Sequence, residues 1–415
     1  MKNNNRQLST VNCQLATADR GGLTQINADQ FHQLSTLNCQ LPMTINYRLF
    51  FNNNPATREQ LDRVEEITVE QEIDMAWEAR MQIPIATDDK GNWTGEDEDF
   101  LAEFTQVRVE IELGDEVFVP LIDGSIVEAG DRMNSEPGQS MKTVVIQDES
   151  IRLNRDDRIF RFDNLLDREI ASQLFGEIEQ IATTEIENTP APSSSLPPVV
   201  VQRGTAMQLL RSLARRQGMH AYVLPGNEPG QSIGCFKSFP TQTDGLPPLI
   251  VLGAGRNVAE FHPTNNAQRP ARVTASTLSI FDKTITQRTS DLGQLDLLGE
   301  EPTFASEGNT ATQILYPRDG DAVDLDRVVT AEALRSSYST EATGTVLNDT
   351  YSAVLTPYRV VSVAGVNQRH SGDYLIRKVT HSLTRSYYSQ SFTLQRNARS
   401  AGSSAGLANL AGSIF

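Results

Sequence analysis

Alternating apolar and polar positions run through the first half of the chain and predict β-strands. In "QVRVEIEL" (residues 106–113) every second side chain is apolar, and the residues between them are charged. The apolar face carries Val107, Val109, Ile111 and Leu113, and the charged face carries Arg108, Glu110 and Glu112. A strand with one buried and one solvent-facing side is expected from this pattern. "EVFVPLIDGSIVEAG" (116–130) and "SMKTVVIQDES" (140–150) predict further strands that close a barrel or sandwich near residue 150.

Two helices are predicted in the middle of the chain. Before them, "RVEEITVEQEIDMAWEARMQIPI" (63–85) mixes alternation with a short helical stretch. Asn164 is placed to cap the first helix, whose apolar stripe is Leu166, Ile170, Leu174, Ile178 and Ile181. A Pro/Ser linker at Asn188–Pro198 follows. The second helix begins near Thr205 and stops at Gly218, with Leu209, Leu210 and Leu213 facing a core, and "MHAYVL" is then a strand.

From Leu249 the pattern again predicts strands, in "RVTASTLSIFD", "YRVVSVAG", "GDYLIRKVTHSLT" and "SQSFTLQRN". The last two form a strand, a turn and a strand. In the first of them Leu375, Arg377, Val379, His381 and Leu383 share one face. His381 has no partner motif, so we interpret it as a structural residue. Its hairpin, with Leu375-Ile376, is similar to that of Leu121-Ile122 and "MKTVVIQD", which suggests paired barrels.

The expected fold is mainly β with a smaller α/β part, in which two β-barrels flank a helix-containing domain. We assign residues 43–160 to the first barrel, 161–248 to the helix-containing domain, 249–398 to the second barrel and 399–415 to a flexible tail. Residues 1–42 are polar, and "RQLSTVNCQL" at Arg6–Leu15 recurs as "HQLSTLNCQL" at His32–Leu41. Two copies are too few for a repeat fold. This segment is either a flexible, disordered arm or a translated upstream repeat, with Met43 the true start.

Composition narrows the function classes. The 415 residues carry a formal net charge of −17, which argues against a nucleic-acid binder. Residues 41–190 hold 34 acidic and 13 basic side chains, whereas residues 356–415 hold 1 acidic and 7 basic ones. Charges of opposite sign at the two ends favour contacts between subunits, although two ordinary solvated surfaces explain them equally well. No secretory signal or membrane span is visible, so direct membrane insertion is not expected.

The search for chemistry finds no catalytic, cofactor-binding or metal-binding residue. Gly253-Ala254-Gly255 lacks the third glycine of a dinucleotide fingerprint, because Val258 stands there. The acidic run Gly95–Phe100 lacks the spacing of a calcium loop. The five histidines (His32, His220, His262, His370 and His381) and three cysteines (Cys13, Cys39 and Cys235) form no metal or disulfide pattern.

Several of these stretches resemble a known family. "SGDYLIRKVTHSLTRSYYSQSFTLQRN", "GTAMQLLRSLARRQGMHAYVL", "EITVEQEIDMAWEARMQIPI" and "GDEVFVPLIDGSIVEAG" are similar to segments of phage late-control D proteins and of the hub portion of VgrG-like (valine-glycine-repeat) spike proteins. The resemblance covers about residues 43–398 and rests on spaced patterns.

The resemblance implies a structural baseplate hub of a phage tail or contractile injection system. Such a hub is a homotrimer whose two hub-type β-barrels per chain offer six quasi-equivalent positions, so it adapts a hexameric inner tube to a trimeric spike. This sequence ends about 18 residues after the last strand, so we expect a separate spike protein. The other implied partners are the inner tube protein and other baseplate components, after cytoplasmic assembly into the particle. The alternative is a tail-associated enzyme that degrades cell wall or glycan, which diffuse carboxylates alone support.

Overall fold

The structure is a computed structural model. It describes residues 45–94, 98–113, 117–136, 138–191, 199–253, 255–269, 272–278, 283–291, 293, 295–303, 310–316, 324–347 and 350–398. The chain divides into two units, Met1–Pro42 and Met43–Phe415, and the description that follows concerns the second. The N-terminal repeat and the C-terminal tail lie outside the described residues.

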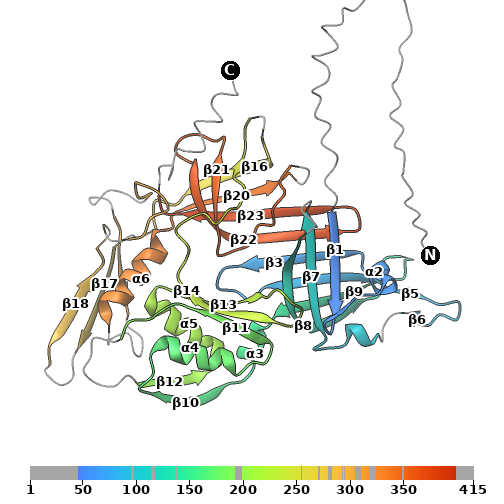
Figure 1. Cartoon of the computed structure of the whole chain (residues 1–415), viewed down its shortest axis with the longest axis horizontal. Coiled ribbons are helices and arrows are strands. Elements are labelled where there is room, and N and C mark those ends of the chain that lie inside the picture. The colour runs from blue at the N-terminus through green and yellow to red at the C-terminus, as the bar shows by residue number, and fades with distance from the viewer. Residues whose placement is uncertain are drawn as a thin grey trace, which may run out of the picture. The chain divides into compact units, whose positions relative to one another are not determined.

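A 13-stranded sheet dominates the described residues, which confirms the mainly β fold class. Its strand order is β16-β20-β23-β22-β3-β4-β9-β8-β7-β1-β2, and β21 and β15 are attached beside β22 (Figure 1). The strands are β1 Ile45–Phe51, β2 Asn54–Pro55, β3 Glu66–Glu72, β4 Glu78–Pro84, β7 Gln106–Leu113, β8 Phe118–Arg132, β9 Met141–Asp148, β15 Leu249–Ile250, β16 Val258–Asn265, β20 Thr340–Val346, β21 Val360–Ala364, β22 Gly372–Thr384 and β23 Tyr388–Arg396.

This sheet contains the same six-stranded arrangement twice. We define the first β region as β1, β3, β4, β7, β8 and β9, and the second β region as β15, β16, β20, β21, β22 and β23. Numbered one to six along the chain, the strands of both regions follow the order 2-3-6-5-4-1 across the sheet. All neighbours within the regions are antiparallel except β15 and β21, which pair in parallel over two residues. The chain therefore carries an internal structural duplication.

The duplication extends to the register of the strands. In each region the fifth strand is bulged against the sixth, after Ile126 in β8 and after Ile376 in β22. If Ile126 is matched with Ile376, the residues paired beside them on the neighbouring strands match as well. Across the fifth, sixth, third and second strands these residues are Ile126, Ile146, Ala79 and Val69 in the first region, and Ile376, Leu394, Ala342 and Pro263 in the second. We call each such line of paired residues a row. The hairpins compared in the sequence thus occupy matching places, but Ile376 corresponds to Ile126 rather than to Ile122.

The two regions are joined edge to edge. Residues 66–72 of β3 pair with residues 378–384 of β22, and we call this antiparallel pairing the seam. Each region has its own apolar core, one around Ile67, Ile111 and Ile146, the other around Tyr374, Phe392 and Leu394. No strand pairing among the described residues closes either region into a ring, so the two expected barrels are seen as two cores on one continuous sheet.

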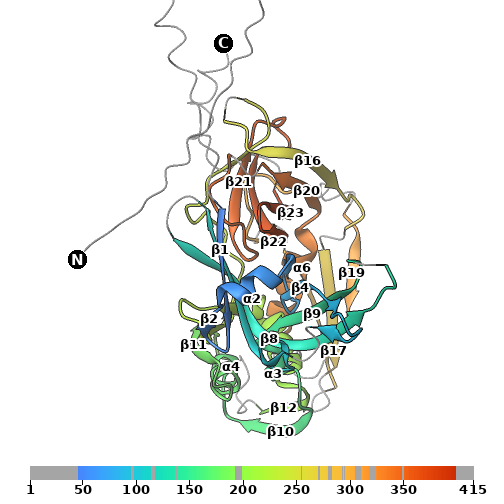
Figure 2. The same ribbon diagram turned by 90° about the vertical axis from the view of Figure 1, so that its right-hand side faces the viewer.

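An α/β part lies between the two regions in sequence and packs beneath the sheet (Figures 1 and 2). It consists of β10 Arg158–Asp163, α4 Asp167–Gly176, β11 Ile181–Ile186, β12 Val199–Gly204, α5 Ala206–Gln217, β13 His220–Pro225 and β14 Ser232–Lys237. Helix α4 is shorter than its predicted stripe, because it ends at Gly176 and Ile181 begins β11. Asn164 has a left-handed φ of 56° and does not cap the helix, since Leu166 occupies the N-cap position.

Helix α5 matches its prediction, and its buried face gives a stability test. Leu210 and Leu213 are buried, whereas Leu209 is only partly buried against the same core. We expect Leu210→Ala to lower the free energy of unfolding by about 2–5 kcal/mol, because it removes buried methyl groups and leaves a cavity. Leu209→Ala is the matched control and should cost less. An unchanged melting temperature for Leu210→Ala would show that the assigned face is wrong.

A second helix-containing segment is inserted between β16 and β20; its first strand was predicted from the sequence, but its helix was not. It contains β17 Arg272–Leu278, β18 Ile285–Thr289, β19 Thr312–Leu315 and α6 Leu325–Ser337. The three strands form a separate sheet in the order β18-β17-β19, and Val329 and Ala333 of α6 share a small core with it. The part of the chain after Leu249 is therefore not made of strands alone.

Short elements complete the described part of the fold. They are α2 Arg58–Arg63, β5 Ala86–Thr87, β6 Trp93–Thr94, the 3-10 helix η1 Asp99–Leu101 and α3 Ser150–Leu153. The helical stretch predicted within residues 63–85 is wrong, because β3 and β4 are joined there by a tight turn in which Asp74 has a φ of 61°. No helix in the described ranges has the length and apolar character needed to cross a bilayer.

The charged face predicted for β7 is not solvated. Arg108 and Glu110 are 2% and 3% exposed, because the turn between β13 and β14 covers that side of the strand. Arg108 Nε lies 2.7 Å from Glu110 Oε1, and its Nη1 lies 3.0 Å from Asp123 Oδ2 of β8. The guanidinium also donates to the carbonyls of Asn227 and Glu228 in the covering turn. This buried charge cluster fastens the α/β part to the first β region.

Candidate functional site

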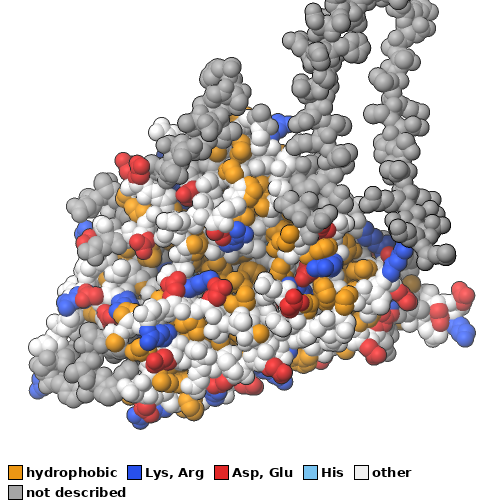
Figure 3. Space-filling model, viewed as in Figure 1, with side chains coloured by type: hydrophobic (Ala, Val, Ile, Leu, Met, Phe, Trp, Pro, Cys, Tyr) orange, Lys and Arg blue, Asp and Glu red, His pale blue; other side chains and the backbone are white. Residues whose placement is uncertain are grey.

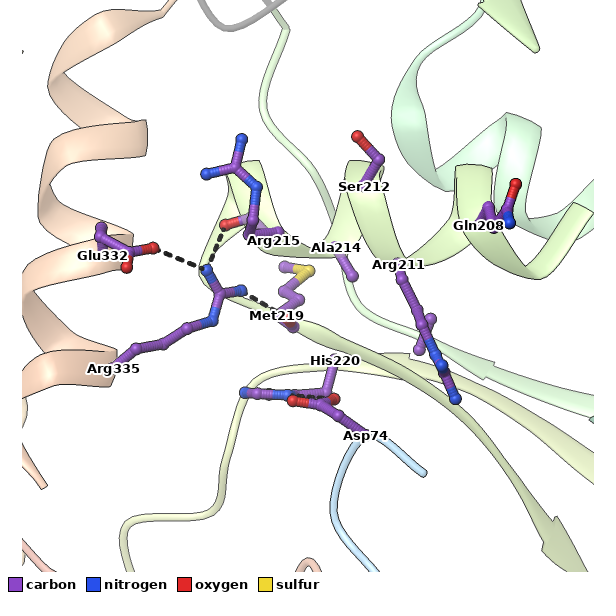
Figure 4. Close-up of a pocket in the computed structure, with 11 residues that line it drawn as sticks. Asp74, Gln208, Arg211, Ser212, Ala214, Arg215, Met219, His220, Glu332 and Arg335 are labelled. Atoms are coloured by element: carbon purple, nitrogen blue, oxygen red, sulfur yellow. Dashed lines mark hydrogen bonds and ion pairs between the residues drawn. The ribbon is translucent and has the colours of Figure 1, made fainter. Parts of the chain in front are cut away.

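A cavity of about 460 Å³ lies where the α/β part, α6 and the β3–β4 turn meet (Figure 4). It is lined by Asp74, Gln208, Arg211, Ser212, Ala214, Arg215, Met219, His220, Ala221, Glu332 and Arg335. Three arginines, two carboxylates and one histidine thus converge from four separate segments of the chain. We call it the cationic cavity.

Helix α5 supplies one wall of the cationic cavity, and local interactions fix both of its ends. Thr205 and Gln208 form a capping box, in which each side chain accepts a hydrogen bond from the other's backbone N–H. Gly218 ends the helix with a left-handed φ of 74°. With the apolar face turned to the core, Arg211 and Arg215 lie four residues apart outside that face and both line the cavity. In Figure 4 the Arg211 side chain extends toward the side where Asp74 lies, and the Arg215 guanidinium points away from it.

Arg335 of α6 closes the other side. Its guanidinium donates to the carbonyl of Arg215 at 3.0 Å and to that of Met219 at 3.2 Å. These carbonyls lie at the C-terminal end of α5, where the helix dipole favours a cation. Glu332 lies 3.7 Å from the same guanidinium. Arg335 therefore joins the two helices. Arg211, by contrast, has a buried Nε without a hydrogen-bond partner in the described part of the chain.

His220 and Asp74 form a close pair at the floor of the cavity. His220 Nδ1 lies 2.8 Å from Asp74 Oδ1, and the imidazole stacks on Phe239 with 3.7 Å between ring centroids. Burial lowers the pKa of His220, although the Asp74 carboxylate opposes this shift. Burial also acts to raise the pKa of Asp74, but the hydrogen bond and charge of His220, with Arg335 and Arg211, lower it on balance. The two shifts thus belong to one pair, which is joined by a hydrogen bond between His220 Nδ1 and the Asp74 carboxylate.

The chemistry available in the cavity is anion binding. Guanidinium groups bind carboxylates and phosphates through charge-assisted hydrogen bonds. A nucleophilic enzyme would need a hydroxyl or thiol hydrogen-bonded to the histidine. Within the described ranges the hydrogen bond of His220 goes to Asp74, and no serine, threonine or cysteine side chain bonds to it. The cavity was not anticipated from sequence, although the four-residue spacing of Arg211 and Arg215 beside an apolar helix face was a visible signal.

The weak motifs of the sequence lie elsewhere. Gly253 and Gly255 belong to a turn between β15 and β16, which leads into a strand rather than the helix of a dinucleotide site. Of the acidic run, residues 95–97 lie outside the described part, and Asp99 begins η1. Cys235 is buried with a free thiol, while Cys13 and Cys39 lie outside the described residues. The described residues contain no cluster of three or more His, Cys, Asp or Glu side chains able to hold a metal ion.

His381 lies in the core at the seam. Its Nδ1 lies 2.8 Å from the Tyr388 hydroxyl, and its Nε2 lies 3.2 Å from Gln71 Oε1 of β3. The amide of Gln71 in turn donates to the carbonyl of Leu121 at 2.7 Å, where β8 is bulged against β7. Complete burial lowers the pKa of His381 to about 3, so the ring is neutral at physiological pH. These bonds connect the second β region to two strands of the first.

Opposite charges flank the seam on its solvent side. Lys378 Nζ lies 2.9 Å from Glu70 Oε2, and Arg377 Nη2 lies 3.4 Å from Glu72 Oε1. The acidic first region thus meets the basic closing segment within one chain. Elsewhere on the face shown in Figure 3, acidic and basic side chains are interspersed rather than gathered by sign.

Comparisons with known proteins identify the fold. No protein-family model matches the sequence, and no curated protein matches it. The 43 kDa tail protein of prophage MuSo2 from Shewanella oneidensis is 16% identical over 85% of this chain and 98% of its own, with a TM-score of 0.56. A tail protein from Neisseria meningitidis MC58 is 14% identical over 85% of this chain and 96% of its own, with a TM-score of 0.55.

A third similar structure comes from a protein complex. A chain of the Francisella PdpA–VgrG complex is 9% identical over 91% of this chain and 62% of its own, with a TM-score of 0.51. At such low identities the similarity shows the fold alone. The resemblance that the sequence patterns indicated is therefore confirmed in part: the fold is shared with phage tail proteins and with a chain of a VgrG complex, and the assignment to late-control D proteins or to a hub stays a prediction.

Proposed function

We propose that this chain is a structural hub of a phage tail or contractile injection system. In this role three copies form a ring that binds the six-fold inner tube on one side and a separate trimeric spike on the other. The shared fold with tail proteins supports the general role. The internal duplication supports the specific one.

The duplication is the observation that carries the proposal. A three-fold ring of chains with one copy of a binding unit offers three positions to a hexamer, whereas two copies per chain offer six. Here both β regions have the same strand order, and both place a bulge at the same point of the fifth strand. Three chains therefore present six similar surfaces, which meets the six-fold symmetry of a tube without a second protein.

The chemistry of the site is consistent with a binding role rather than catalysis. The cationic cavity gathers guanidinium groups, and among the described residues no hydroxyl or thiol side chain bonds to His220. An acidic side chain or chain terminus of another baseplate component is the kind of group that it would bind. We further propose that the protein assembles in the cytoplasm into the baseplate of a tail-like particle. Its partners there would be the inner tube protein, the spike and other baseplate components.

The mass of the purified protein tests the proposal most directly. We expect light scattering and native mass spectrometry to give three times the chain mass. Electron microscopy of the protein with its tube partner should then show a three-fold ring with six similar lobes. A monomer with a single open cleft, or a ring without three-fold symmetry, would rule the hub out.

A further inference from the structure

The seam joins particular strands of the two duplicated regions. It pairs the second strand of the first region, β3, with the fifth strand of the second region, β22. Strand β22 is long enough to pair with its own fourth strand, β21, over residues 372–375 and then with β3 over residues 378–384 on the same side. The seam therefore uses the part of a fifth strand that extends beyond the fourth.

The equivalent strands, which are the second strand of the second region and the fifth strand of the first region, each have an edge that is unpaired among the described residues. Strand β16, the second strand of the second region, pairs with β20 on one side, and no described residue pairs with its other side. Strand β8, the fifth strand of the first region, pairs with β7 only up to Ser125. Its residues 128–132 pair with β9 on one side, are exposed, and have no described strand on the β7 side.

We propose that β16 of one chain pairs with residues 128–132 of β8 in the next chain, as an intermolecular copy of the seam. This inference rests on the proposed function, because it requires a ring of chains. The matched rows give the register of the proposed joint. Gly130 occupies the place in the first region that Thr380 occupies in the second, and Thr264 occupies the place in the second region that Glu70 occupies in the first. Because Thr380 faces Glu70 in the seam, Gly130 should face Thr264 between chains. Three such joints and three seams would form six similar joints around the ring.

The side chains at the two free edges are complementary in this register. Leu383 opposite Ile67 in the seam corresponds to Met133 opposite Phe261. Met133 is 50% exposed in the single chain, and Phe261 is only partly buried, so their contact would cover apolar surface. On the other face Arg132 would lie diagonal to Glu260, a cross-strand distance at which opposite charges attract.

Pro263 makes the proposed joint weaker than the seam. The backbone N–H of Asn266 donates to the carbonyl of Ser339 beside β20. Backbone groups point alternately to the two sides of a strand, so those of position 263 point away from β20, to the free edge. Proline has no N–H, so the joint lacks one hydrogen bond that the equivalent Val69 can make in the seam. Proline on an edge strand also disfavours unlimited edge-to-edge association, which suits a ring that must stop at three chains.

Disulfide trapping tests the register. We would combine Gly130→Cys with Thr264→Cys in a chain carrying Cys13→Ser and Cys39→Ser, and oxidise it mildly. A Cβ at Gly130 meets no atom within 4 Å, so the cysteine fits. Gly130 and Thr264 would form a pair without mutual backbone hydrogen bonds, whose Cα atoms are about 4.5 Å apart and within disulfide range. We expect covalent dimers and closed covalent trimers on a non-reducing gel.

Two paired variants serve as controls. Glu70→Cys with Thr380→Cys places the equivalent disulfide in the seam, within one chain. It should oxidise, and the band on the non-reducing gel should stay at the mass of a single chain. Gly130→Cys with Glu260→Cys shifts the register by four residues, about 13 Å along a strand, and should give no cross-linked trimer.

The outcomes separate this inference from the proposed function. Covalent trimers from the Gly130/Thr264 pair alone support the joint. A protein with trimer mass that fails to cross-link, while the seam control oxidises, overturns the joint and leaves the hub standing. Equal cross-linking by the shifted pair also overturns the register. A monomeric mass overturns both.

Discussion

Replacing Arg108 with methionine is expected to lower the free energy of unfolding by about 3–5 kcal/mol, which is typical when one partner of a buried ion pair is removed. Asp123 would stay buried at 2% exposure, and among the described residues the hydrogen-bond donor that it would keep is the Gly230 N–H, at 2.8 Å. Burial already raises the pKa of Asp123, and the Gly230 N–H and Arg108 oppose that shift. Glu110 would keep Arg48, whose Nε lies 2.9 Å from its Oε2. Chemical denaturation at neutral pH measures the loss.

The sheet provides a matched control for this substitution. Arg80 and Glu78 also form an ion pair two residues apart on one strand, at 2.8 Å, but the Arg80 side chain is 63% exposed. Exposed pairs contribute about 0–1 kcal/mol, so Arg80→Met should have little effect. The double change Arg108→Met with Asp123→Asn should recover part of the loss, because it removes the carboxylate that Arg108→Met leaves buried without its cation. Equal effects of Arg108→Met and Arg80→Met would show that the buried cluster contributes nothing to stability.

Acidification is expected to weaken the protein through His381. Its pKa is about 3 in the folded chain and about 6.5 in an unfolded one, so below pH 6.5 the unfolded state binds a proton that the folded state does not. Stability contributed by the neutral ring is therefore complete above pH 6.5 and is lost as the pH falls toward 3. At about 1.4 kcal/mol per pKa unit, this amounts to about 2–3 kcal/mol between pH 7.5 and 4.5.

The measurement compares the pH dependence of the variants rather than their stability at one pH. His381→Gln cannot take up the proton, so its unfolding free energy should fall less steeply over that range than that of the unchanged protein. Parallel slopes for His381→Gln and the unchanged protein would mean that His381 is not the buried acid-sensitive group.

Features encoded by neighbouring residues could be predicted from the sequence. Helix α5 begins and ends where expected because Thr205, Gln208 and Gly218 fix its ends locally. The β22–β23 hairpin was visible because its alternation is continuous across a short turn. Helix α6 was missed because Val328, Val329 and Thr330 are β-branched and favour a strand, although Asp324 was available as its N-cap.

Features that depend on distant parts of the chain could not be predicted. Arg108 is buried by a turn about 120 residues away, and no local pattern distinguishes it from a solvated arginine. The cationic cavity needs Asp74 and Arg335 to approach α5 from opposite ends of the sequence. The duplication lies in strand order and register. Its matching rows share Ile126 with Ile376 and Ala79 with Ala342, which is too little to reveal from side-chain patterns alone which strands correspond.

The seam also has a consequence for how the protein is made. Its two strands are separated by roughly 300 residues, which a ribosome adds in about 15–60 s at 5–20 residues per second. During that interval the edge of β3 has no partner within its own chain, and unpaired edges promote aggregation. Truncated products would never cover this edge. Synthesis of the β22–β23 hairpin is therefore the step that covers the β3 edge and completes the sheet.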